Sequence, residues 1–189
     1  TQTGGSGLAA PTHRTRPMKH RTPWKEALLC GLLLCLTLLT ACGGSSAQAE
    51  TAGSCTVSIS CATILDNRGH LNAAKADYVP DDGVILPTTE VTFTAGETAF
   101  DLLHRVCREN NIPMESSWSP LYKSAYIEGI ANLYEFDCGK LSGWMYSVNG
   151  EFPNYGCSAY ALQDGDVICW VYTCDLGEDV GGGYAAGGE

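Results

Sequence analysis

Histidine is scarce in this chain, and the motifs that would accompany a catalytic histidine are missing. Only two of the four histidines, His70 and His104, follow residue 42, and His104 falls beside the apolar stripe of an expected helix. No Gly-x-Ser-x-Gly motif, paired-carboxylate pattern or Cys/His arrangement appears in a context that supports catalysis. We therefore predict that the protein is not an enzyme.

Metal-binding patterns are also lacking. The cysteines and histidines do not form the paired clusters typical of a zinc site. Asp164 and Asp166 flank a glycine, but a calcium ion needs six or more oxygen ligands from a longer loop. A tight turn explains these aspartates better, and we expect no metal site and no certain cofactor.

Basic residues are few, and most of them lie near the start of the chain. The protein has 11 basic and 21 acidic side chains, and five of the basic ones precede Cys42 whereas only one acidic residue does. The part from Cys42 onward is therefore strongly acidic and would be repelled by phosphate backbones. We expect no nucleic-acid partner.

No apolar run reaches the roughly 20 residues that a membrane span requires. A basic segment precedes the 13-residue apolar run at 27–39, which is typical of a secretion signal. Leu39-Thr40-Ala41-Cys42 follows and resembles the bacterial lipobox, in which the cysteine is lipidated; the alternative is simple cleavage near Ala41. The sequence thus predicts a leader and lipoprotein signal peptide at 1–41, a flexible spacer at 42–53, and an extracytoplasmic protein whose membrane partner is reached by a lipid anchor on Cys42, at the bacterial cell membrane.

Cysteine, in contrast, is plentiful after residue 42, as in exported proteins stapled by disulfides. Cys55 and Cys61 lie about 20 Å apart if their strand is straight, too far to bond to each other. If a hairpin turned at 164–165, Cys157 and Cys174 would be diagonal neighbours on one face and Cys169 would point to the other. We expect the pairs Cys157–Cys174 and Cys107–Cys138, with Cys169 unpaired.

Strand and helix signals place one α+β domain at 54–174, with its core at 84–174. Helical apolar spacing predicts one helix over 98–109, with Thr98 as its N-cap and Asp101 three residues on. Asn-Gly and Asp-Gly turns at 149–150 and 164–165 predict two successive hairpins within 141–174. Short strands are expected at 84–86, 91–93 and 126–130, a long connection at 64–82, and an acidic, glycine-rich tail at 175–189.

Aromatic residues are the main functional candidates. Alternation puts Trp144 and Tyr146 on one face of their strand and Trp170 and Tyr172 on one face of theirs, packed on the helix or open to solvent. We predict that Trp144, Tyr146, Tyr155, Trp170 and Tyr172 form a surface that stacks on a small flat ligand. The alternative is a protein-binding, adhesion or structural module of the cell envelope with no small ligand.

Several blocks resemble the transcobalamin-like C-terminal domain family, a domain of unknown function in bacterial surface proteins and lipoproteins. They lie at 91–93, 96–103, 126–130, 162–170 and, most specifically, 142–150, which reads SGWMYSVNG. The resemblance implies a small β-grasp-like domain, with a mixed or antiparallel sheet and hairpins packed on one helix. It also implies cobalamin or another corrinoid as the candidate ligand, with the rest of the site supplied by a partner domain.

Overall fold

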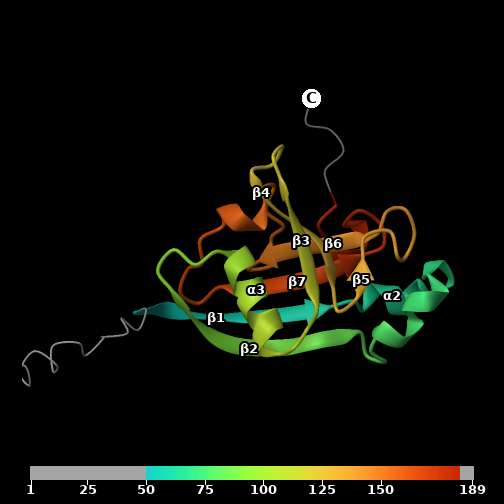
Figure 1. The fold of residues 1–189 in the computed structure, drawn as a ribbon, viewed down its shortest axis with the longest axis horizontal. Helices are drawn as coiled ribbons and strands as arrows, with labels where there is room; N and C mark the ends of the chain where they lie inside the picture. The colour runs from blue at the N-terminus through green and yellow to red at the C-terminus, as the bar shows by residue number, and fades with distance from the viewer. Residues whose placement is uncertain (1–49, 184–189) are drawn as a thin grey trace, which may run out of the picture. The chain divides into compact units, whose positions relative to one another are not determined.

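Strands dominate the part of the chain that the structure describes, and there they form two sheets (Figure 1). The computed structural model describes residues 50–183, so Cys42, the signal segment and most of the predicted spacer lie outside the described residues. The strands are β1 Thr51–Ser60, β2 Val84–Thr94, β3 Met114–Ser119, β4 Ser124–Ile130, β5 Leu133–Tyr134, β6 Gly143–Val148 and β7 Val167–Thr173. The helices are α2 Thr63–Asp66 and α3 Ala99–Glu109, with 3₁₀ turns η1 Arg68–His70, η2 Ala73–Tyr78, η3 Cys157–Ala159 and η4 Glu178–Val180.

The larger sheet is mixed and has the order β2-β1-β7-β6. Its central pair, β1 and β7, runs parallel, whereas β1 with β2 and β6 with β7 are antiparallel. β2 continues through Pro87 as one strand where two short strands were predicted. A proline is tolerated there because β2 is an edge strand and needs no donor on its outer side.

Neither predicted hairpin forms, although both turns do. Asn149 and Gly150 have positive φ values of 55° and 87°, and Val148 bridges to Glu151, but no strand follows. Pro153 and Gly156 interrupt the next segment, which instead leads through η3 to the turn before β7. β6 therefore pairs with β7 across a long loop, and β7 takes β1 as its second neighbour.

Helix α3 packs on the larger sheet as the sequence predicts. Thr98 accepts a hydrogen bond from the Asp101 amide and the Asp101 carboxylate accepts one from the Thr98 amide, which completes a capping box. Its buried face, including Leu102 and Val106, meets the alternating buried residues of β1, such as Val57 and Ile59. The core of the domain lies between this helix and the sheet.

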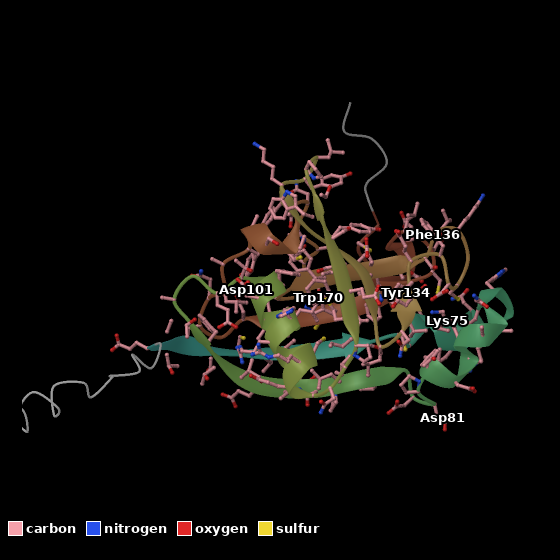
Figure 2. The ribbon with its side chains drawn as sticks, viewed as in Figure 1. Lys75, Asp81, Asp101, Tyr134, Phe136 and Trp170 are labelled. Atoms are coloured by element: carbon pink, nitrogen blue, oxygen red, sulfur yellow. The ribbon has the colours of Figure 1, made fainter. Side chains whose placement is uncertain are left out.

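The segment between β1 and β2 was predicted as a connection, and it contains α2 and two 3₁₀ turns. One lysine fixes it to the chain around β5. Lys75 Nζ donates a hydrogen bond to the Asn132 carbonyl at 2.7 Å, lies 3.3 Å from an Asp137 carboxylate oxygen and sits 4.4 Å from the centre of the Tyr134 ring (Figure 2). The three partners of the Lys75 ammonium group therefore hold in place a segment whose sequence shows little helical or strand periodicity.

The second sheet, β3-β4-β5, is built on a hairpin that projects beyond the rest of the fold (Figure 1). β4 matches the strand predicted at 126–130, whereas β3 was not predicted because its sequence MESSWS has few apolar residues. The side chains of β3 are mostly exposed, and the strand is held by pairing with β4 and by a hydrogen bond of 2.6 Å from the Tyr134 hydroxyl to Glu115. The outer part of the hairpin presents Trp118, Leu121 and Tyr122 to solvent.

Both ends of the predicted domain extend further than expected. β1 begins at Thr51, inside the predicted spacer. The first nine residues of the predicted tail are also ordered, because the Asp179 carboxylate accepts a hydrogen bond from the Cys174 amide at 2.7 Å and another from the Thr173 hydroxyl at 2.5 Å. Across residues 50–183, none of the helices is both apolar and long enough to traverse a membrane.

Candidate aromatic binding site

A cavity of about 250 Å³ opens between the β3–β4 hairpin, strand β6 and the loop at 153–157. Three separate segments build it because β4 passes close to both β6 and η3. Six of the residues that line it are aromatic: Tyr122, Tyr126, Trp144, Tyr146, Tyr155 and Trp170. An aromatic lining of this kind favours stacking on a ring system.

Two stacked rings form the buried part of the cavity. Tyr146 and Trp170 lie 5.4 Å apart between ring centres, with 28° between their planes. The Tyr146 hydroxyl donates a hydrogen bond to the Tyr155 carbonyl at 2.9 Å, which joins β6 to the loop at 153–157. Burial raises the pKa of Tyr146 above its ordinary value, so this hydroxyl stays protonated and able to donate.

Trp170 has an unpaired polar group. Only 2% of the residue is exposed, and its indole N–H has no hydrogen-bond partner among the described residues. A buried donor without an acceptor costs free energy, so it is rare in folded proteins. The Trp170 side chain borders the cavity, whereas its N–H is buried away from solvent.

The rim of the cavity is formed by exposed tyrosines. Tyr122, Tyr126 and Tyr155 are 68%, 43% and 48% exposed. The Tyr126 hydroxyl donates a hydrogen bond to Glu135, and burial together with that carboxylate raises the Tyr126 pKa. Tyr122 comes from the β3–β4 hairpin and Tyr155 from the loop after β6.

A second cavity, of about 280 Å³, adjoins the first. The two share Tyr126, Trp144 and Met145 in their linings. The second extends to Phe136 and Leu176, both exposed, and to Lys140. Each of the two cavities is slightly smaller than the usual small-molecule site. We call the two adjoining cavities the aromatic groove.

Four of the five predicted binding residues line the first cavity, and the fifth does not. Tyr172 is fully buried, and its hydroxyl donates to the Tyr134 carbonyl at 2.6 Å. It packs edge-on against Trp144, with ring centres 5.3 Å apart, and so helps to fix the position of a ring that lines both cavities. The Trp144 indole N–H donates to the Leu133 carbonyl at 2.8 Å, which fixes the ring that borders both cavities.

Sequence reasoning missed Tyr122 and Tyr126 as lining residues. Tyr126 was placed correctly in a strand, but the hairpin that carries both rings to β6 depends on β3, which has no clear strand pattern. The signal available was the dense aromatic content of residues 118–126. That content alone does not tell which ring faces the core.

The predicted disulfides are not formed among the residues that the structure describes. All seven cysteines of the described region are thiols in the structure, and each predicted pair is divided between two different core clusters. Cys107 and Cys157 belong to the cluster under α3, whereas Cys138 and Cys174 belong to the cluster around α2. The predicted pair of Cys157 with Cys174 rested on a hairpin at 164–165, and that hairpin does not form.

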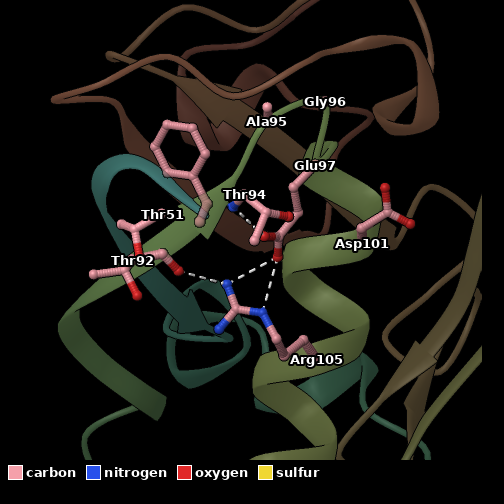
Figure 3. A pocket seen from close by; sticks show the side chains of 9 residues that line it. Thr51, Thr92, Thr94, Ala95, Gly96, Glu97, Asp101 and Arg105 are labelled. Carbon is pink, nitrogen blue, oxygen red and sulfur yellow. Dashed lines mark hydrogen bonds and ion pairs between the residues drawn. The ribbon is translucent and has the colours of Figure 1, made fainter. Parts of the chain in front are cut away.

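Another depression lies between the end of β2 and α3, and it is lined by charged side chains that pair with each other (Figure 3). Arg105 lies 2.8 Å from the Glu97 carboxylate and donates to the Thr92 carbonyl at 2.8 Å. Glu97 in turn accepts from the Thr94 amide. These polar groups tie the β2–α3 turn to the helix. In residues 50–183 there is no cluster of three His, Cys, Asp or Glu side chains placed to hold a metal ion.

Comparison with known proteins gives one family match. Residues 96–174 match the family described as domain of unknown function (DUF4430), within the region of the sequence resemblance. No curated protein matches the chain.

Two solved structures resemble parts of the chain. A candidate metal binding protein from Ruminococcus gnavus ATCC 29149 is 17% identical over 64% of this chain and 96% of its own, with a TM-score of 0.38. Haptocorrin in complex with Cbi is 18% identical over 70% of this chain and 28% of its own, with a TM-score of 0.42. The matched part is thus little more than a quarter of the haptocorrin chain, and the ligands in these names belong to those proteins.

Proposed function

We propose that this protein is a non-enzymatic binding module that captures a small flat ligand in the aromatic groove. We assign it a β-grasp-like fold, with α3 held by the mixed sheet, and a lipid anchor on Cys42 at the outer side of the bacterial cell membrane. The observation that carries the proposal is the cavity lined by six aromatic residues, with two stacked rings inside and exposed tyrosines at its rim.

The rings lining the cavity differ in their freedom to bind. Tyr146 and Trp170 are held by their mutual stacking and by burial, so they form a rigid wall. Tyr122 and Tyr155 keep most of their surface in water, and covering them with a ring would release that water.

The size of the groove limits what can enter. Its two cavities, at about 250 and 280 Å³, are each slightly smaller than the usual site of a drug-sized ligand. A corrinoid is our foremost candidate because it is flat, broad and rich in amide acceptors. Such a ligand would lay one edge in the groove and leave the other for a partner domain to cover.

A protein-binding or adhesion role is the second candidate function. The β3–β4 hairpin exposes Trp118, Leu121 and Tyr122 at 63%, 81% and 68%. Neighbouring exposed apolar side chains of this size are typical of interaction sites. In this alternative the hairpin contacts a protein of the cell envelope and the groove holds no small ligand.

Replacing Tyr155 with alanine is expected to weaken ligand binding about 3- to 10-fold, the value of one aromatic contact. Titration of the full chain in detergent with cobinamide and cobalamin, followed by tryptophan fluorescence and calorimetry, measures the change. Tyr78→Ala is the matched control, because Tyr78 is 45% exposed, close to the 48% of Tyr155, and lies in η2 outside the groove.

Each outcome of this titration has a distinct meaning. Binding that Tyr155→Ala weakens and Tyr78→Ala does not supports the groove. Equal affinity in all three proteins would remove the groove as the site, and no binding of either corrinoid by the unaltered chain would make the protein-binding role the leading one.

Replacing Cys42 with alanine is expected to abolish lipid attachment and leave the precursor unprocessed. Two acyl chains anchor a protein durably, whereas an unmodified chain has no such hold on the bilayer. Mass spectrometry of the N-terminal peptide and membrane fractionation measure the effect, with Cys35→Ala as the control within the apolar run. A lipid mass shift that persists in Cys42→Ala would disprove the anchor.

A further inference from the structure

Cys138 and Cys174 meet beside helix α2, although 35 residues separate them in the chain. Cys138 lies in the loop between β5 and β6, and Cys174 directly follows β7. Both belong to the core cluster that contains Ile64 of α2 and Tyr172 of β7. The fold therefore brings the end of its last strand against the loop that precedes β6.

The two sulfur atoms contact the two ends of the same short helix, α2. The Cys174 thiol lies 3.8 Å from Thr63 Oγ1, and the Cys138 thiol donates to the Asn67 carbonyl at 3.4 Å. Asn67 is itself tied to Thr63 by a hydrogen bond of 2.8 Å. The two thiols lie close enough for each to affect the pKa of the other, and burial raises the pKa of Cys174 to about 12.

We propose that Cys138 and Cys174 form a disulfide when the protein meets an oxidising environment. The oxidant is a disulfide of a small thiol or of a thiol–disulfide oxidoreductase. The Cys174 thiol, which is the more exposed of the two, loses a proton and its sulfur forms a mixed disulfide, releasing one thiol of the oxidant. The Cys138 sulfur, after losing its own proton, then displaces the second thiol, so two electrons pass to the oxidant and one S–S bond forms.

The other cysteines are less well placed to form a disulfide with Cys138 or Cys174. Cys61 shares the cluster, but it is fully buried at the end of β1, where its amide donates to the Gly83 carbonyl. Cys157 lies in the other cluster, with its thiol 3.6 Å from the Ala125 carbonyl. Cys169, on β7, is half-buried, and its strand neighbours are Ser58 and Ser147.

The bond would act on the aromatic groove as well as on stability. Lys140 and Leu141, which follow Cys138, line the second cavity, and so does Leu176, which follows Cys174. Closing a ring of about 37 residues restricts the unfolded chain. For a domain of this size, we expect the oxidised protein to melt about 10 °C above the reduced one.

Peptide mapping without reduction tests the pairing directly. Trypsin leaves Cys138 in the peptide 124–140 and Cys157, Cys169 and Cys174 together in 141–189, because no lysine or arginine follows Lys140. We expect the full chain, oxidised with glutathione disulfide in detergent, to give 124–140 linked to 141–189. Cleavage before aspartate then separates Cys157 from 166–174, and fragmentation distinguishes Cys169 from Cys174.

The outcomes separate this pair from the alternatives. A link to 124–140 from 106–108 or from the peptide that contains Cys61 and ends at Arg68, a link within 141–189, or Cys138 found as a free thiol after oxidation would overturn the proposal. As a second measurement, Cys174→Ser should abolish the melting difference between oxidised and reduced protein, whereas Cys169→Ser should keep it. A difference that survives in Cys174→Ser would also overturn it.

Discussion

Replacing Trp170 with alanine is expected to lower the free energy of unfolding by about 3–5 kcal/mol. Trp170 is among the largest fully buried side chains, and it packs between α3 and the sheet in the main core cluster (Figure 2). Its removal leaves a cavity and takes away the ring on which Tyr146 stacks. Because the free energy of unfolding of a small domain is only about 5–15 kcal/mol, this one change would remove much of the stability of the protein.

Urea unfolding followed by circular dichroism measures this loss. Trp118→Ala is the matched control, since the same atoms are removed from a side chain that is 63% exposed on the β3–β4 hairpin. We expect a change of at most about 0.5 kcal/mol for the control. Similar losses in the two variants would mean that Trp170 is not the core residue described here.

Replacing Gly83 with alanine is expected to destabilise the protein by at least about 3 kcal/mol. Gly83 has a φ of 70°, which disfavours any side chain, and a Cβ built on it would lie 2.4 Å from the Ala62 Cα. The atom in the way is backbone, so no side-chain rotation relieves the clash. The Gly83 carbonyl also accepts a hydrogen bond of 2.7 Å from the Cys61 amide, which fixes the approach of the two segments.

Gly96→Ala separates the two causes. Gly96 has a similar φ of 81°, but nothing lies within 4 Å of the position its Cβ would take. We expect this variant to lose only about 1–2 kcal/mol, from backbone conformation alone. The melting temperatures of the two variants measure the difference, and equal losses would show that the close approach at Ala62 is not tight.

Local signals predicted local structure well. The 98–109 helix was found with its cap, because Thr98, Asp101 and the apolar stripe all lie within one short segment. The alternation of Val57 and Ile59 in β1 was equally visible. The predicted pairing of strands was wrong, because the Asp-Gly sequence at 164–165 forms the same turn whether or not a strand precedes it.

The aromatic site was predicted in part for the same reason. Period-2 alternation correctly put the rings of Trp144 and Tyr146 on one face, where they contact Tyr172 and Trp170. Alternation does not say how deeply a ring is buried, so Tyr172 was counted as a surface residue although α2 and β5 cover it. Tyr122 and Tyr126 lie at the site because β3 pairs with β4. This pairing depends on tertiary structure more than on strand propensity.

The parallel pairing of β1 with β7 governs when the domain can fold. The first and last strands lie side by side at the centre of the sheet, and partners such as Thr56 and Val167 are separated by more than 100 residues of chain. Contacts between distant residues form slowly because a long loop must close first. Until the ribosome has released β7, β1 lacks its central neighbour and α3 has no complete sheet to cover, so the emerging chain depends on remaining unfolded without aggregating.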